Sequence, residues 1–147
     1  MIEARVRNIF IGAGAYYLSW WIANPLSFGY GKLIGRVIYR GAFERVVVLP
    51  IVSQLPMAIV AAAVGACVVI LVESQHRIYW ALFPSGLYAF FSYFGTTWAE
   101  PPSVLNRMSQ VVGALFPALA CLAGALLTLR RRTSFRKLKH SPSSSEQ

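Results

Sequence analysis

The residues of this chain that could take part in acid–base, metal-binding or nucleophilic chemistry are few. All five acidic residues are glutamates, so paired catalytic carboxylates and oxygen-rich cation sites have few candidate groups. His76 lies in a short polar segment and His140 near the C-terminus, while Cys67 and Cys121 lie within apolar stretches and form no Cys-x-x-Cys motif. Single cysteines in apolar stretches usually pack as small apolar residues. We therefore expect no catalytic residue, no metal site and no cofactor, and the sequence favours a role other than catalysis.

The composition indicates a membrane protein. Hydrophobic residues make up 56% and charged residues 13% of the chain, and the mean hydropathy is +0.55. Soluble domains carry about 25% charged residues, so this composition argues against an ordinary soluble domain and against a disordered chain. The formal net charge is +9, but six of the fourteen Lys and Arg residues follow residue 129 and the others fall mostly beside apolar stretches. That distribution predicts contact with anionic lipids and no binding of nucleic acid.

Four stretches without Asp, Glu, Lys or Arg are long enough to cross a bilayer as helices. They cover residues 8–31, 46–72, 78–99 and 108–129. The hydrocarbon core takes about 20 helical residues, and a helix satisfies its backbone hydrogen bonds within one such segment. The sequence therefore predicts an all-α integral membrane protein with four transmembrane helices, in which residues 1–147 form one polytopic domain.

The first of these stretches is the weakest. Asn24-Pro25 interrupts it and leaves about 15 continuous apolar residues, which as a helix reach roughly 22 Å. It therefore crosses with little tilt, continues past a proline kink, or enters the bilayer only partly. A cleaved signal peptide is the alternative, because Arg5 and Arg7 precede a short apolar stretch. Since Trp20-Trp21 leaves no small-residue cleavage site near its end, we interpret the segment as part of the mature protein.

The distribution of positive charge predicts the orientation in the membrane. With four crossings, nine Lys and Arg residues lie on the side of the two termini and five lie on the opposite side. The nine are Arg5, Arg7, Arg77 and the six Lys and Arg residues of the tail, and the five are Lys32, Arg36, Arg40, Arg45 and Arg107. Because positive residues accumulate on the inner side, we expect both termini on the cytoplasmic or equivalent inner side. The membrane would be a plasma membrane or an organellar inner membrane, such as that of mitochondria.

Two segments carry basic residues that could contact lipid headgroups. In the connection 31–45, Lys32, Arg36, Arg40 and Glu44 recur every four residues among apolar ones. This pattern predicts an amphipathic helix in the headgroup plane, or a short connecting helix with a solvated face. The second segment is the basic polar tail, 130–147. The residues predicted to contact lipid headgroups or partners, with a bound phospholipid expected, are Lys32, Arg36, Arg40, Arg45, Arg130, Arg131, Arg132, Arg136 and Lys137.

Small residues recur at helical spacing in the second and fourth stretches. Rows in which small residues are four apart let two helix backbones approach closely, which is a main packing device in lipid. We expect these faces of the second and fourth spans to pack against other helices. The predicted packing residues are Ala58, Ala62, Gly65, Ala66, Ala120 and Gly124.

Prolines inside the predicted spans could have a functional role as well as a structural one. Pro56, Pro84 and Pro117 each remove a backbone hydrogen bond and bend a helix. Gln54, two residues before Pro56, is the strongly polar side chain within the second span. Bent helices line cavities in transporters, so Gln54 and Pro56 could line a cavity. The alternative is that Gln54 forms a hydrogen bond to a neighbouring helix.

The sequence as a whole favours a non-catalytic accessory subunit of a larger integral membrane complex, of the respiratory or photosynthetic kind. Its partners would be other integral membrane subunits and anionic lipids. Two alternatives stay open. A small transporter or pore would use the bent helices, and a membrane-embedded enzyme acting on a lipophilic substrate would use the basic connection around Arg36, Arg40, Glu44 and Arg45.

Overall fold

The computed structural model describes residues 2–34, 41–72, 77–97 and 103–139, and these residues form helices with no strand among them. This confirms the all-α fold class. The helices are α1 (Ile2–Ile34), the π-helical turn η1 (Glu44–Val48), α2 (Leu49–Ser53), α3 (Leu55–Leu71), α4 (Arg77–Thr97) and α5 (Val104–Lys139).

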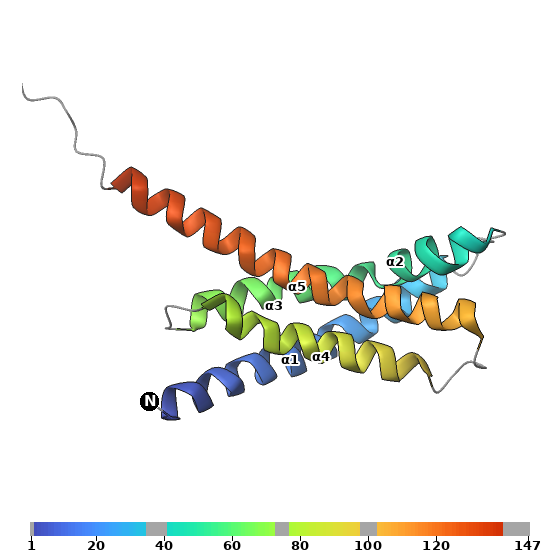
Figure 1. Ribbon diagram of the computed structural model, residues 1–147, viewed down its shortest axis with the longest axis horizontal. Coiled ribbons are helices and arrows are strands. Elements are labelled where there is room, and N and C mark those ends of the chain that lie inside the picture. The colour runs from blue at the N-terminus through green and yellow to red at the C-terminus, as the bar shows by residue number, and fades with distance from the viewer. Residues whose placement is uncertain (1, 35–40, 73–76, 98–102, 140–147) are drawn as a thin grey trace, which may run out of the picture.

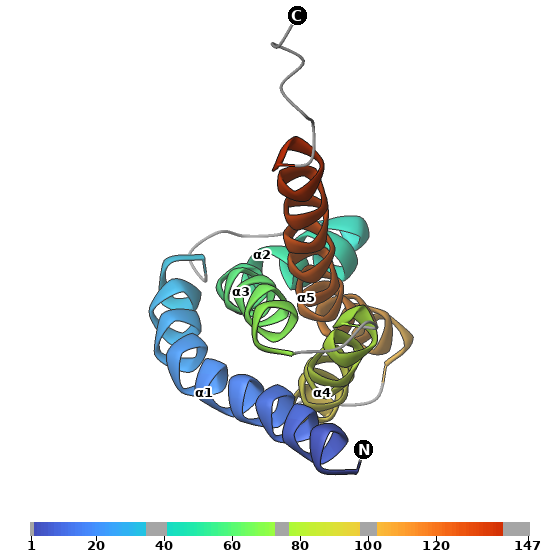
Figure 2. The same cartoon turned by 90° about the vertical axis from the view of Figure 1, so that its left-hand side faces the viewer.

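The four long helices form a bundle of two parallel pairs (Figure 1). The helices α1 and α4 run in one direction, and α3 and α5 run in the opposite direction. Viewed along the bundle, α3 lies between α1 on one side and α4 and α5 on the other (Figure 2), and it contacts all three. The start of α1, the end of α3 and the start of α4 therefore share one end of the bundle.

The helix α1 continues past the proline at which the sequence predicted an interruption. It runs unbroken for 33 residues with Pro25 inside it, which at 1.5 Å per residue is about 50 Å. Asn24 and Pro25 are both exposed. The helix thus continues past the proline, while its path through a bilayer stays a prediction.

The connection 31–45 is not one separate helix in the parts that the structure describes. Its first residues belong to α1, Gly41 is a bend, and its last residues begin the next helix. The Gly41 N–H donates to Glu44 Oε2 at 3.3 Å, and the Arg45 N–H donates to the Gly41 carbonyl at 3.1 Å. The apolar Leu33 and Ile34 extend α1 rather than start a new helix. The intervening residues, which include Arg36 and Arg40, lie outside the described residues.

The second predicted span is bent at Gln54. The helical segments Glu44–Ser53 and Leu55–Leu71 meet at 54°, and Gln54 leaves the helical conformation with φ −91° and ψ 4°. Pro56 cannot donate a backbone hydrogen bond to the preceding turn, and Pro50 occupies the first turn of α2. The bend expected from Pro56 is thus present.

One described helix is long and apolar enough by itself to cross a membrane: the segment Val104–Arg132 of α5. The bent pair Glu44–Ser53 and Leu55–Leu71 meets the same condition when counted as one span. Four crossings remain a prediction.

Candidate functional site

The contact between α3 and α5 brings two of the predicted packing glycines against opposite backbones. A Cβ placed on Gly65 would lie 1.9 Å from the Cys121 carbonyl oxygen, and one placed on Gly124 would lie 2.0 Å from the Ala62 carbonyl oxygen. These separations leave room for a glycine hydrogen and for no carbon atom. Each glycine therefore presents a Cα–H group to a carbonyl of the other helix, a contact that recurs where helices cross closely.

The other predicted packing residues lie beside this crossing with less complete burial. Ala58 is buried, while Ala62, Ala66 and Ala120 are half-buried. Gly65 and Gly124 are both buried. The structure thus brings Ala62 against Gly124, and Gly65 against the backbone of Cys121. Cys121 is not among the packing residues predicted from the spacing of small residues.

Buried polar side chains connect α4 to α5. Ser85 Oγ donates to the Ala118 carbonyl at 3.0 Å, and Cys121 Sγ lies 4.0 Å from the Ala81 carbonyl. Both cysteines are free thiols, Cys121 buried and Cys67 exposed. These contacts satisfy buried polar groups, and they give Ser85 a structural partner in place of the catalytic base that a nucleophile needs.

A second polar contact, between α1 and α4, was not predicted from the sequence. Ser19 Oγ donates to the Tyr16 carbonyl at 2.6 Å, so its hydroxyl is left to accept a hydrogen bond from the Tyr88 hydroxyl. The Tyr16 ring packs edge-on to Tyr88 at 4.9 Å between centroids and stacks with Phe91 at 5.6 Å. The sequence feature that could have indicated this contact is the spacing of Tyr16 and Ser19, which lie one helical turn apart on one face of α1.

The residues of the predicted cavity, Gln54 and Pro56, lie at the bend. Gln54 and Pro56 are half-buried. A Cβ placed on Gly113 would lie 3.9 Å from Gln54 Cγ and 3.6 Å from Pro50 Cβ. Gln54 Cγ and Pro50 therefore lie next to Gly113 of α5, close enough that an added Cβ at position 113 would be in ordinary van der Waals contact with both.

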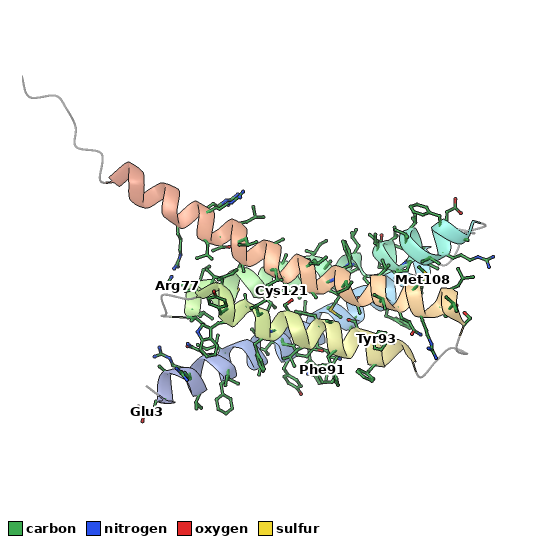
Figure 3. The ribbon with its side chains drawn as sticks, viewed as in Figure 1. Glu3, Arg77, Phe91, Tyr93, Met108 and Cys121 are labelled. Carbon is green, nitrogen blue, oxygen red and sulfur yellow. The ribbon has the colours of Figure 1, made fainter. Side chains whose placement is uncertain are left out.

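The charged residues that the structure describes lie toward the two ends of the bundle. Figure 3 shows Glu3 and Arg77 at the end where α1 begins and Met108 toward the opposite end. The described basic residues at the first end are Arg5, Arg7, Arg77, Arg130, Arg131 and Arg132, and those at the second end are Lys32, Arg45 and Arg107. Arg136 and Lys137 continue α5 beyond the first end.

Two of these basic side chains make specific contacts within the bundle. Arg77 Nη1 donates to the Val69 carbonyl at 3.5 Å, and thereby satisfies a carbonyl in the last turn of α3. At the opposite end, Lys32 Nζ lies 4.5 Å from the centre of the Phe28 ring, a cation–π contact. Arg5, Arg131 and Arg132 are exposed.

Among the described residues, no three His, Cys, Asp or Glu side chains come together as a metal site would require. No protein family, curated protein or solved structure matches this chain. Three features of the structure therefore bear on function. They are the α3–α5 and α1–α4 contacts, the apolar outer surface of the bundle, and its strongly basic end.

Proposed function

We propose that this chain is a four-span membrane protein that acts as a non-catalytic accessory subunit of a larger integral membrane complex. The observation that carries the proposal is the outer surface of the bundle. Large apolar side chains are exposed along all four long helices, and charged side chains occur only near the two ends of the described bundle.

Exposed large apolar side chains are spread over all four long helices of the described bundle. Soluble monomers rarely expose a contiguous apolar patch of more than a few hundred Å². The exposed side chains include Phe10, Leu18, Trp21, Ile22 and Phe28 on α1, Ile59, Ile70 and Leu71 on α3, Leu82, Phe90 and Phe94 on α4, and Leu105, Leu115, Leu119, Leu126 and Leu127 on α5. Lipid chains and partner helices are the environments in which such a surface is stable.

The spacing between charges along α1 and α5 supports a crossing by each of these two helices. Arg7 and Lys32 flank the uncharged part of α1, and Arg107 and Arg130 flank that of α5. At 1.5 Å per residue these pairs are about 38 and 35 Å apart, which exceeds the roughly 30 Å of the hydrocarbon core. The excess of Arg at the end where α1 begins supports placing both termini on the cytoplasmic or equivalent inner side.

The proposed subunit role rests on the side chains that the bundle exposes on its surface. Its aromatic side chains can pack against helices of other integral membrane subunits and against phospholipid. The buried hydroxyl and thiol groups of Ser19, Ser85 and Cys121 contact groups within the bundle, as expected of a scaffold.

The test is extraction from the native membrane in a mild detergent, followed by native mass measurement and identification of co-purifying chains. A stoichiometric assembly with different chains is the expected result. A monomer or homo-oligomer built only of 16.3 kDa units would contradict the subunit role. Release of the protein from membranes by alkaline carbonate would contradict membrane insertion itself.

A small transporter or pore is the second candidate, favoured by the 54° bend at Gln54. Bent and broken helices form transport sites in several membrane folds. Under this alternative, the chain alone in phospholipid vesicles releases entrapped K⁺ or carboxyfluorescein. Gln54→Leu and Pro56→Ala would then abolish release without changing the helix content. If the vesicles containing the unmodified chain stay tight, the pore alternative is wrong.

A further inference from the structure

The end of the bundle where α1 begins gathers basic residues from three helices within about one helical turn along the bundle axis. The pairs Gly12 with Pro84 and Tyr16 with Tyr88 show that α1 and α4 run in parallel with an offset of 72 residues, since 84 − 12 and 88 − 16 are both 72. With this offset, Arg5 of α1 is level with Arg77 of α4.

The helix α5 adds its arginines to the same end. Ser85 pairs with Ala118 and Ala81 with Cys121 in the antiparallel α4–α5 contact. Extending this register places position 126 of α5 level with the start of α4. The segment Arg130–Arg132 thus begins about one helical turn, or roughly 6 Å, farther along the bundle axis.

The structure around these arginines matches the boundary of a bilayer. The apolar part of α5 ends at Leu129, and the helix continues through the basic segment to Lys139 while it diverges from the other helices (Figures 1 and 2). Glu3 is the one acidic side chain among the described residues of this end, whereas the opposite end has Glu44 among only three basic residues. The charge excess is therefore concentrated where headgroup phosphates would lie.

We infer that this end of the bundle, formed by Arg5, Arg77 and Arg130–Arg132, is a binding surface for anionic phospholipid, and that it selects lipids with a net negative headgroup over zwitterionic ones. The inference rests on the proposed membrane insertion. Guanidinium groups bind phosphate oxygens through paired hydrogen bonds. Clusters of four or more basic residues directly beside a transmembrane helix attract anionic lipids for the same electrostatic reason.

The experiment compares lipid selection at the two ends of the bundle. In the full chain, Trp80 lies one turn after Arg77 and is half-buried, so a variant in which the other three tryptophans become Phe reports on lipid at the basic end. Leu105→Trp, combined with replacement of all four native tryptophans by Phe, reports near Arg107. Each protein is placed in vesicles of phosphatidylcholine and phosphatidylglycerol, with one or the other lipid brominated, and the ratio of quenching gives the preference for the anionic lipid.

We expect Trp80 to show a preference for phosphatidylglycerol of roughly threefold or more, and the reporter at residue 105 to show a ratio near one. The variant Arg5→Gln/Arg131→Gln/Arg132→Gln, which removes three of the five arginines, should lower the Trp80 ratio by about half or more. The matched control Lys32→Gln/Arg45→Gln/Arg107→Gln removes the same charge from the opposite end and should leave the Trp80 ratio unchanged. Raising NaCl to 0.5 M should weaken the preference, because salt screens exposed charges.

Four results would overturn the inference. Equal ratios at the two reporters, or equal loss in both triple variants, would show a response to net charge alone. Displacement of the anionic lipid by inorganic phosphate would show that the surface binds free phosphate instead. If the protein inserts into the vesicles and resists carbonate but shows no preference, only the lipid inference fails; if it does not insert, the proposed four-span role fails with it.

Discussion

The α3–α5 pair and the α1–α4 pair are both parallel, yet they are held together by opposite means. Between α3 and α5, Gly65 and Gly124 bring the two backbones into direct contact. Between α1 and α4, the contact is made by large side chains, with the Tyr16 and Tyr88 rings 4.9 Å apart and the Ser19 hydroxyl bonded to Tyr88.

The difference lies in how much each contact can adjust. A backbone in contact with another backbone can move only if a whole helix moves, so a single added carbon has a large effect. A ring or hydroxyl can rotate about its side-chain bonds, so the α1–α4 contact tolerates small changes. We expect the stability of the bundle to depend most steeply on the first pair.

The largest effect is expected for Gly124→Ala and Gly65→Ala. The added Cβ would meet a carbonyl oxygen at 2.0 or 1.9 Å, so α3 and α5 must separate, and we expect a loss of about 3 kcal/mol for each substitution. The measurement is reversible unfolding by sodium dodecyl sulfate in mixed micelles, followed by circular dichroism.

The control for these substitutions is Gly14→Ala. A Cβ on Gly14 has no neighbouring atom within 4 Å, so this alanine changes the helix backbone without touching another helix. Equal destabilisation by Gly14→Ala and Gly124→Ala would mean that the close crossing is not what makes α3 and α5 sensitive.

A smaller effect is expected at the α1–α4 contact from Ser19→Ala and Tyr88→Phe. Each removes one hydroxyl of a buried hydrogen bond between the helices, which in membrane proteins contributes about 1 kcal/mol. Because either substitution breaks the same bond, the double variant should lose little more than either single variant. A double-mutant cycle in the same unfolding assay measures this coupling.

Tyr17→Phe provides the matched control for this pair. Tyr17 is the next residue along α1 from Tyr16 but is 61% exposed, so removal of its hydroxyl should leave stability unchanged. Additive losses from Ser19→Ala and Tyr88→Phe would show that the two hydroxyls act separately.

The two contacts also differ in how far the sequence predicted them. Four-residue spacing of small residues pointed to Gly65 and Gly124 because close helix approach in lipid requires residues without bulk. No comparable rule pointed to Tyr16, Ser19 and Tyr88. Aromatic and hydroxyl residues occur throughout the predicted spans, and which of them meet depends on the register between two helices.

The other predictions also divide into those that depend on local properties of the chain and those that depend on tertiary contacts. Pro56 predicted a bend that the structure contains, since a missing N–H is a local property of the chain. Pro25 has the same chemistry, but α1 continues past it as one helix. Fold class followed from composition, whereas helix ends and side-chain partners depended on tertiary contacts.

Gly12→Ala tests the adjustability of the α1–α4 contact more directly. Its Cβ would lie 3.1 Å from Cδ1 of the Phe83 ring, so the ring must move by a few tenths of an ångström. Phe83 is exposed on one side and can rotate, and we therefore expect a change within about 0.5 kcal/mol. A loss as large as that of Gly124→Ala would show that side-chain contacts here are as rigid as backbone contacts.

The smallest effect is expected for Gly86→Ala on α4, where a Cβ would have no neighbour within 4 Å and the position is exposed. In the isolated chain, alanine should stabilise the helix by about 0.5 kcal/mol, because glycine loses more backbone freedom on folding. The same substitution also distinguishes an effect on the stability of the isolated chain from an effect on its assembly with a partner. If a partner helix packs on this face of α4, Gly86→Ala should weaken co-purification of that partner while leaving unfolding of the isolated chain unharmed. Destabilisation of the isolated chain would instead mean that the face is already packed within the bundle.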